Sequence, residues 1–189
     1  MIITTILGSP KRAGNTAKVL EAFERLAAAD HEVFRIDIAE KTIGGCLGCY
    51  ACQRSADAPG CRQDDDFGEV IARIMRSDLV VYSTPVYAWD FTAQMKTLVD
   101  RHFCLVKRKQ PDATAYLLEG KRTMLLATCG GEASSNADLI QEVFKREMDY
   151  LRCRVAGIYI AGSCTAPAAL GDKPETIARQ MMEGLRRIA

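Results

Sequence analysis

The sequence lacks several features that would place it in other broad classes of protein. No apolar run approaches the roughly 20 residues that a membrane-spanning helix needs. With 25 basic and 24 acidic residues, the formal net charge is +1, so the chain lacks the basic field typical of nucleic-acid-binding proteins. The N-terminus has no basic segment ahead of an apolar run, as a signal peptide would, and we expect a cytoplasmic protein in a reducing compartment.

Two common phosphate-binding motifs are also missing. There is no G-x-x-x-x-G-K-[ST], which argues against a Walker NTPase, and no G-x-G-x-x-G, which argues against a dinucleotide fold. Histidine is scarce, and we expect His31 and His102 to be surface or packing residues. We therefore assign no catalytic acid or base.

The first 20 residues nevertheless predict an anion site. Residues 2–7 are apolar and β-branched, as in a buried strand, and a polar loop follows before a helix starts near Asn15. The N–H groups at a helix N-terminus lack intrahelical partners and carry partial positive charge, which favours a phosphate. The residues that we expect to contribute are Ser9, Lys11, Arg12, Gly14, Asn15 and Thr16. An ordinary strand–turn–helix corner without a ligand is the alternative.

The rest of the chain alternates between strands and helices, and its 189 residues suit one domain. The predicted strands are 2–7, 31–38, 78–83, 121–128 and 154–160. The predicted helices are 16–29, 66–76, 92–105, 135–151 and 172 to about 188. This alternation predicts an α/β three-layer sandwich, a flavodoxin-like fold with a five-stranded parallel sheet in the order 2-1-3-4-5. We expect one domain over residues 1–189, with a cysteine-rich loop at 44–62 and an extended connection at 106–120.

Three loops should meet at the C-terminal edge of this sheet, where ligands bind in such folds. The loop at 84–91 follows the third strand and is aromatic, which suits a flat heterocycle such as isoalloxazine. Packing of its aromatic residues in a core or subunit interface is the alternative. The loop at 129–134 should border the other side of the ring. From the end of the fourth strand and the start of this loop we expect contacts by Thr128, Cys129, Gly130 and Gly131.

Four of the eight cysteines form a compact run. Cys46, Cys49 and Cys52 have the spacing C-x2-C-x2-C, and Cys61 follows after eight residues. Thiolates at such spacing can ligate a [4Fe–4S] cluster or zinc, or remain free and form a labile disulfide. We expect the scattered Cys104, Cys153 and Cys164 to be small apolar residues.

Two charged segments have simpler interpretations. The acidic run at 64–66 suits a helix N-terminus, and Asp66 with Glu69 has the spacing of a capping box. The basic run at 107–109 predicts a solvated turn, with a docking patch for an acidic partner as the alternative. Lys96 and Asp100 are four residues apart and should pair along a helix.

Several of these motifs together resemble one group of proteins. The loop G-S-P-x-x-x-G-N-T, the cysteine run, the segment T-P-V-Y and the helix T-A-Q-M-K-x-L-V-D-R resemble those of the NADPH-dependent FMN reductase and iron–sulfur flavoprotein family. The resemblance implies FMN at the three loops, with Pro85, Val86, Tyr87 and Trp89 lining the flavin. It also implies a [4Fe–4S] cluster on Cys46, Cys49, Cys52 and Cys61, and a homodimer or homotetramer. The gap before Cys61 is longer than the compact spacing of that family.

The function that this resemblance implies is an FMN-dependent oxidoreductase. It would pass electrons between NAD(P)H or a ferredoxin-like donor and an acceptor, which is a small-molecule redox substrate or a protein. Three alternatives stay open: a cluster-free NAD(P)H:FMN or quinone reductase, a non-catalytic electron carrier, and a structural zinc-binding domain.

Overall fold

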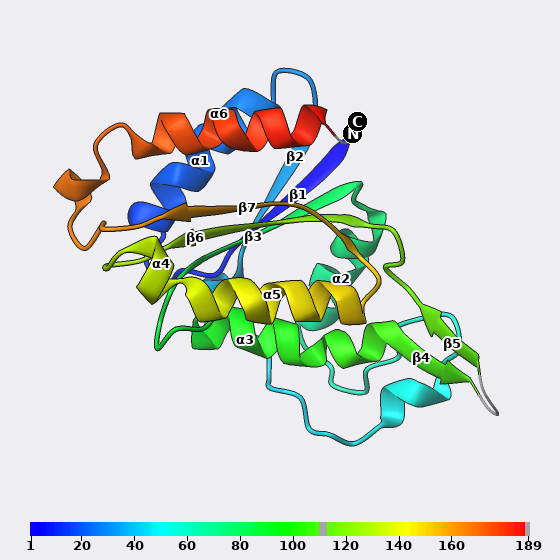
Figure 1. The fold of residues 1–189 in the computed structure, drawn as a ribbon. Coiled ribbons are helices and arrows are strands. Elements are labelled where there is room, and N and C mark those ends of the chain that lie inside the picture. Colours follow the sequence, from blue (N-terminus) through cyan, green and yellow to red (C-terminus); the bar gives the residue numbers. More distant parts are fainter. Residues whose placement is uncertain (110–112, 188–189) are drawn as a thin grey trace.

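Five parallel strands run through the middle of the computed structural model, which describes residues 1–109 and 113–187 (Figure 1). They are β1 Ile2–Leu7, β2 Glu32–Asp37, β3 Leu79–Pro85, β6 Arg122–Thr128 and β7 Arg154–Ala161. The order in the sheet is β2-β1-β3-β6-β7. Because β6 and β7 are the fourth and fifth strands of this sheet, the structure confirms the predicted order 2-1-3-4-5 and the flavodoxin-like class.

Helices cover both faces of the sheet (Figure 1). On one face lie α1 Asn15–Ala27 and α6 Lys173–Arg186. The opposite face is covered by α2 Phe67–Arg76, α3 Ala93–Asp100 and α5 Asp138–Tyr150. Both faces of the central strands are therefore buried, which explains their nearly continuous apolar sequences. In β3, for example, Leu79 and Val81 pack under α1 and α6, whereas Val80 and Tyr82 pack on the other side.

The helix boundaries differ in places from the prediction. The helix predicted at 92–105 is α3 followed by a 3-10 turn, η3 Arg101–Leu105, and the helix predicted at 135–151 is α4 Ala133–Asn136 followed by α5. The predicted end of the last helix at Ile188 lies outside the described residues. In the described part of the chain, no helix has both the length and the apolar character needed to cross a membrane.

The connection expected to be extended at 106–120 contains a hairpin. Strands β4 Val106–Lys109 and β5 Ala113–Tyr116 pair antiparallel, with Val106 opposite Tyr116. Residues 110–112 of this connection lie outside the described residues. In Figure 1 the cysteine-rich loop, coloured cyan, runs below α3 and reaches this hairpin. Gln53 from that loop donates hydrogen bonds from Nε2 to the carbonyl oxygens of Phe103 and Val106, at 3.5 and 3.0 Å.

The predicted capping box at the start of α2 is wrong. Asp66 occupies the N-cap position, but its Oδ2 accepts a hydrogen bond from the Thr42 N–H at 2.6 Å and makes no cap bond. Glu69 instead forms an ion pair with Lys41 at 2.8 Å. The preceding Asp65 makes the local bond to the helix, because its Oδ1 accepts from the Phe67 N–H at 3.2 Å. Tertiary partners on the neighbouring loop therefore take the side chains that local spacing assigned to the helix.

Candidate functional site

The loop between β1 and α1 is held close to the neighbouring strand. The Gly8 N–H donates to the carbonyl oxygen of Ser83 at 2.7 Å, and a Cβ at Gly8 would lie 2.9 Å from the Cβ of Met95. Only glycine fits at this position, where the chain leaves the sheet. Beyond it, the Ser9 hydroxyl accepts from the Lys11 N–H at 3.1 Å, and the Gly14 N–H donates to the Lys11 carbonyl at 3.1 Å. These bonds fold the loop back over the start of α1.

The N-terminus of α1 presents free donors to this loop. Gly14 is the N-cap and supplies no capping side chain, and in the described part of the chain the amide N–H groups of Asn15 and Thr16 have no acceptor. The two side chains are themselves fixed. Asn15 Nδ2 donates to the carbonyl oxygen of Cys164 at 2.5 Å, and the hydroxyls of Thr16 and Thr128 lie 2.7 Å apart. Free amides at a rigid helix N-terminus are the donors that an anion such as a phosphate requires.

A pocket of about 170 Å³ opens above this helix N-terminus. It joins the loops that follow β1, β3 and β6, as the parallel sheet predicts. All but three of the predicted cofactor-binding residues line it. The full lining is Ser9, Lys11, Gly14, Asn15, Thr16, Pro85, Val86, Tyr87, Thr128, Cys129, Gly130, Cys164 and Thr165.

The three predicted residues outside the pocket lining have other partners. Arg12 forms ion pairs with Asp37, at 3.1 Å, and with Glu40. Trp89 is half exposed, and its Nε1 donates to the carbonyl oxygen of Ser135 at 3.2 Å. The Gly131 N–H donates to Asn136 Oδ1 at 2.9 Å. Arg12, Trp89 and Gly131 therefore border the site in this structure without lining it.

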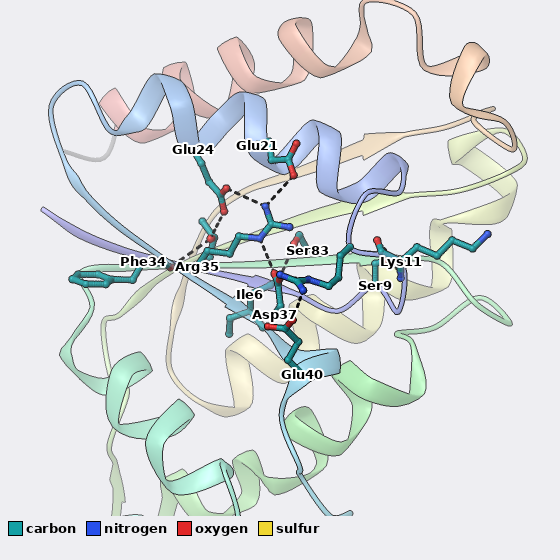
Figure 2. A network of polar contacts seen from close by, with 12 residues as sticks. Ile6, Ser9, Lys11, Glu21, Glu24, Phe34, Arg35, Asp37, Glu40 and Ser83 are labelled. Atoms are coloured by element: carbon teal, nitrogen blue, oxygen red, sulfur yellow. Dashed lines mark hydrogen bonds and ion pairs between the residues drawn. The ribbon is translucent and has the colours of Figure 1, made fainter.

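Figure 2 shows the network around Arg35 and Asp37, which Arg12 joins through its ion pairs with Asp37 and Glu40. Arg35 on β2 lies between Glu21 and Glu24 of α1 and binds Asp37 through Nε at 2.7 Å. Asp37 in turn holds Arg12, so this network neutralises the loop arginine. Lys11 remains as the loop cation that has no carboxylate partner among the described residues, and it lines the pocket.

The loop after β3 contains a tight turn with unusual backbone angles. Ala88 and Trp89 have φ values of 48° and 62°, and the N–H groups of Tyr87 and Asp90 each donate to the other residue's carbonyl, at 3.1 and 3.0 Å. Two consecutive positive φ angles are typical of a type I′ turn and are costly for residues other than glycine, asparagine or aspartate. On this turn Tyr87 and Trp89 are 47% and 51% exposed, and Tyr87 lines the pocket. Such strain is common at binding sites.

Two pocket residues, Cys164 and Thr165, were missing from the prediction. Both follow β7, whose C-terminal end lies at the same edge as those of β1, β3 and β6. A Cβ at Gly130 would lie 2.9 Å from Cγ2 of Thr165, so these two loops are in close contact. Burial raises the pKa values of both the Cys129 and the Cys164 thiols, which favours their neutral forms. The sequence could have predicted them, because the loop after the fifth parallel strand ends at the same edge of the sheet as the other loops.

A second pocket, of about 260 Å³, contains all four cysteines of the predicted metal site. Cys46 and Cys49 are exposed, Cys61 is half-buried and Cys52 is buried. A fifth thiol, Cys104 from η3, lines the same pocket. Among the described residues, no three His, Cys, Asp or Glu side chains are grouped so as to hold a metal ion. The predicted ligands therefore line one pocket, but in this structure they are not gathered closely enough to ligate one metal ion.

Arg101 forms part of the wall of this cysteine pocket. Its side chain is 1% exposed, pairs with Asp65 at 2.5 Å, and donates from Nη2 to Cys61 Sγ at 3.2 Å. The ring of Phe67 lies 4.0 Å from the guanidinium carbon. Burial favours the neutral thiol of Cys61, but hydrogen bonds from Gln63 and Arg101 outweigh it and lower the Cys61 pKa. Arg101 therefore favours a thiolate at this position.

Lys107 corrects the prediction of a solvated basic turn at 107–109. Its side chain is 1% exposed, and Nζ donates to the carbonyl oxygens of Cys52 and Pro59, both at 2.8 Å. Burial of the aliphatic stem and two carbonyl acceptors explain why this charge lies inside the fold. Because Lys107 is inaccessible, it cannot belong to a docking patch. It fixes the segment between the last two cysteines of the predicted metal site.

Helix α3 connects the two pockets. Thr92 caps its start, accepting from the Met95 N–H at 3.2 Å and donating to the Gly8 carbonyl oxygen at 2.5 Å beside the first pocket. Its end leads into Arg101 and Cys104 in the wall of the second. At roughly 1.5 Å per residue, Thr92 and Arg101 are separated by about 14 Å along the helix. The predicted pair of Lys96 and Asp100 is confirmed between these ends.

Comparisons with known proteins bear on both pockets. A family model described as NADPH-dependent FMN reductase matches residues 1–163. An iron–sulfur flavoprotein of Methanosarcina thermophila is 30% identical over 146 residues, which are 76% of this chain and 71% of that protein. Another, from Archaeoglobus fulgidus, is 40% identical over 97 residues, 51% of this chain but only 43% of that relative's length. A solved NAD(P)H:quinone oxidoreductase from Methanothermobacter marburgensis has the same fold, with a TM-score of 0.68, 21% identity and coverage of 98% and 93% of the two chains.

Proposed function

The chain belongs to the NADPH-dependent FMN reductase family, and from that premise we propose that it is an FMN-dependent oxidoreductase that passes electrons between NAD(P)H or a ferredoxin-like donor and an acceptor. The observation that carries the proposal is the pocket above α1, where free amides and three converging loops meet. We propose that residues 1–189 form one domain.

The residues of the first pocket fit FMN. The free N–H groups of Asn15 and Thr16 suit the phosphate, and Lys11 adds positive charge beside it. Pro85, Val86 and Tyr87 supply apolar surface for the ring. Bound FMN would supply hydride and electron chemistry, while the loops position the ring and exclude water from one side.

Flavin titration of the apoprotein tests this assignment. We expect the fluorescence of FMN to be quenched when it binds. Riboflavin, which lacks the phosphate, should bind much more weakly. Lys11→Met should weaken FMN binding about fivefold, since a single exposed charge contributes about 1 kcal/mol, and should leave riboflavin binding unchanged. Lys18→Met removes the same charge from the exposed face of α1 and serves as the control. The proposal would be contradicted if the wild type bound FMN and riboflavin with equal affinity, or if it bound neither flavin.

We further propose that the cysteine pocket holds a [4Fe–4S] cluster. The support is the convergence of Cys46, Cys49, Cys52 and Cys61 on one pocket, together with relatives named as iron–sulfur flavoproteins. A cluster would supply one-electron transfer beside the two-electron flavin. The cluster-free reductase remains the second candidate, since a solved neighbour of the same fold is a quinone oxidoreductase.

Metal analysis of anaerobically purified protein separates these two candidates. Cys46→Ser should remove iron and sulfide but leave FMN bound, because the two pockets lie at opposite ends of α3. Cys153→Ser is the control, since Cys153 lies outside both pockets and its thiol bonds to the Leu118 carbonyl oxygen. Wild-type protein with flavin but without iron would favour the cluster-free reductase.

We also propose a homodimer or homotetramer. Leu139, Val143 and Tyr150 are partly exposed, at 55%, 37% and 38%, and their spacing places them on one face of α5. A second copy of the chain would bury this stripe. Light scattering of the wild type and of Val143→Glu checks this, and a monomeric wild type would contradict it.

A further inference from the structure

Two buried cations lie at the cysteine pocket: Arg101 lines it, and Lys107 lies behind it, bonded to the backbone of the lining residue Cys52. Lys107 is 1% exposed, and among the described residues it has no carboxylate partner, only the carbonyl oxygens of Cys52 and Pro59. Arg101 is 2% exposed and has Asp65 as its carboxylate partner. A buried charge without a counter-charge is costly in a folded protein. This cost is reduced when an anionic group occupies the space beside it.

The guanidinium of Arg101 has an unused hydrogen-bond donor. Its Nη2 donates to Cys61 Sγ at 3.2 Å, but its Nε is buried and has no acceptor in the part of the chain that the structure describes. Asp65 and the ring of Phe67 hold the guanidinium in place. The other carboxylate of the pocket lining, Asp100, is paired with Lys96. The pocket thus presents positive charge and a donor to its thiols.

We propose that Arg101 and Lys107 are positioning residues that balance the charge of a thiolate-ligated cluster in the cysteine pocket and raise its reduction potential. The inference rests on the proposed function. Reduction of the cluster adds one electron and one negative charge, with no bond made or broken, and the electron comes from reduced flavin or, in the assay, from dithionite. Nearby positive charge and N–H···S hydrogen bonds stabilise the more negative state. Arg101 acts directly on Cys61, and Lys107 acts through its charge behind Cys52.

The test is a redox titration of the full-length protein, purified anaerobically and followed by electron paramagnetic resonance. Lys107→Met should keep iron and FMN but lower the equilibrium constant for cluster reduction at least tenfold, which is 59 mV for a one-electron couple. Arg101→Lys keeps the charge and loses the forked donor, so we expect a smaller decrease. Lys145→Met removes a charge from the exposed face of α5 and should match the wild type.

The outcomes separate this inference from the proposed function. A wild type without iron refutes the cluster and this inference together. A wild type with iron, and variants with iron and an unchanged potential, refutes this inference alone. If Lys107→Met loses iron while keeping FMN, then Lys107→Arg decides between charge and shape. Recovery of iron in Lys107→Arg supports charge balance. An equal loss of iron shows that only the shape of the loop matters and overturns the inference.

Discussion

Asp65 should be the most important single carboxylate for the stability of the cysteine-rich half of the fold. Its Oδ2 accepts from Arg101 at 2.5 Å and from the Gly44 N–H at 2.9 Å, and its Oδ1 accepts from the Phe67 N–H at 3.2 Å. One side chain therefore joins the start of the cysteine loop, the start of α2 and the end of α3. Its side chain is only 12% exposed, and that of Arg101 is 1% exposed.

Asp65→Asn keeps the shape of this side chain and removes its charge. Breaking a buried ion pair by changing one partner costs about 3–5 kcal/mol, because the other charge stays buried and unpaired. The amide oxygen of asparagine can still accept one backbone bond, so we expect a loss near the lower end, about 3 kcal/mol. With a urea m-value of about 2 kcal/mol/M, the unfolding midpoint should fall by about 1.5 M.

Urea unfolding of the metal-free protein measures this loss, with Asp64→Asn as the matched control. Asp64 is the exposed neighbour in the same acidic run, and a surface substitution of this kind changes stability by at most about 0.5 kcal/mol. A loss below about 1 kcal/mol for Asp65→Asn, or the same loss for both variants, would refute the reasoning.

The pH dependence gives a second check on Asp65. Burial favours the neutral acid, but the bonds from Arg101 and from the Gly44 N–H outweigh it and hold the Asp65 pKa below its usual value. A lowered pKa in the folded state stabilises the fold above the unfolded value, about 3.9, and this stabilisation is lost as pH falls through the folded value. The stability difference between wild type and Asp65→Asn should therefore be constant near neutral pH and shrink below about pH 4.

Two further predictions concern the loops around the pockets. Gly8→Ala places a Cβ 2.9 Å from Met95 Cβ and should lower stability by about 1–3 kcal/mol. Gly68→Ala, in an open position of α2, should instead raise stability by about 0.5–1 kcal/mol. Thermal unfolding measures both changes, and an unchanged stability of Gly8→Ala would contradict the close approach. Burial, with a smaller effect of Cys52, raises the pKa of Cys104 to about 12. We therefore expect Cys104→Ser to retain iron and Cys61→Ser to lose it, and the reverse result in metal analysis would make Cys104 the fourth ligand.

The sheet and the first pocket follow from the sequence because both depend on regular rules. Apolar β-branched runs separated by amphipathic helices specify parallel strands, and parallel strands bring the loops after β1, β3 and β6 to one edge. The same rule covers Cys164 and Thr165 after β7. They were not predicted because the loop at 162–171 has no aromatic or basic residue that would indicate a contact with a ring or a phosphate. The position of Arg12 could not be predicted, because Asp37 and Glu40 bind it from a distant segment.

The second pocket depends on contacts that spacing does not reveal. The sequence shows four cysteines but not the buried charges that surround them, because a basic run is normally exposed and an acidic run normally caps a helix. In this fold Lys107 turns inward to the carbonyl oxygens of Cys52 and Pro59, and Asp65 turns to Arg101. Lys107 bonds to the backbone of Cys52, and Arg101 bonds to the thiol of Cys61. Asp65 bonds to the backbone of Gly44, just before the first of the four cysteines. The polar residues around the cysteine loop are therefore best understood as its scaffold, which holds Cys52 and Cys61 in place while Cys46 and Cys49 stay exposed at the surface.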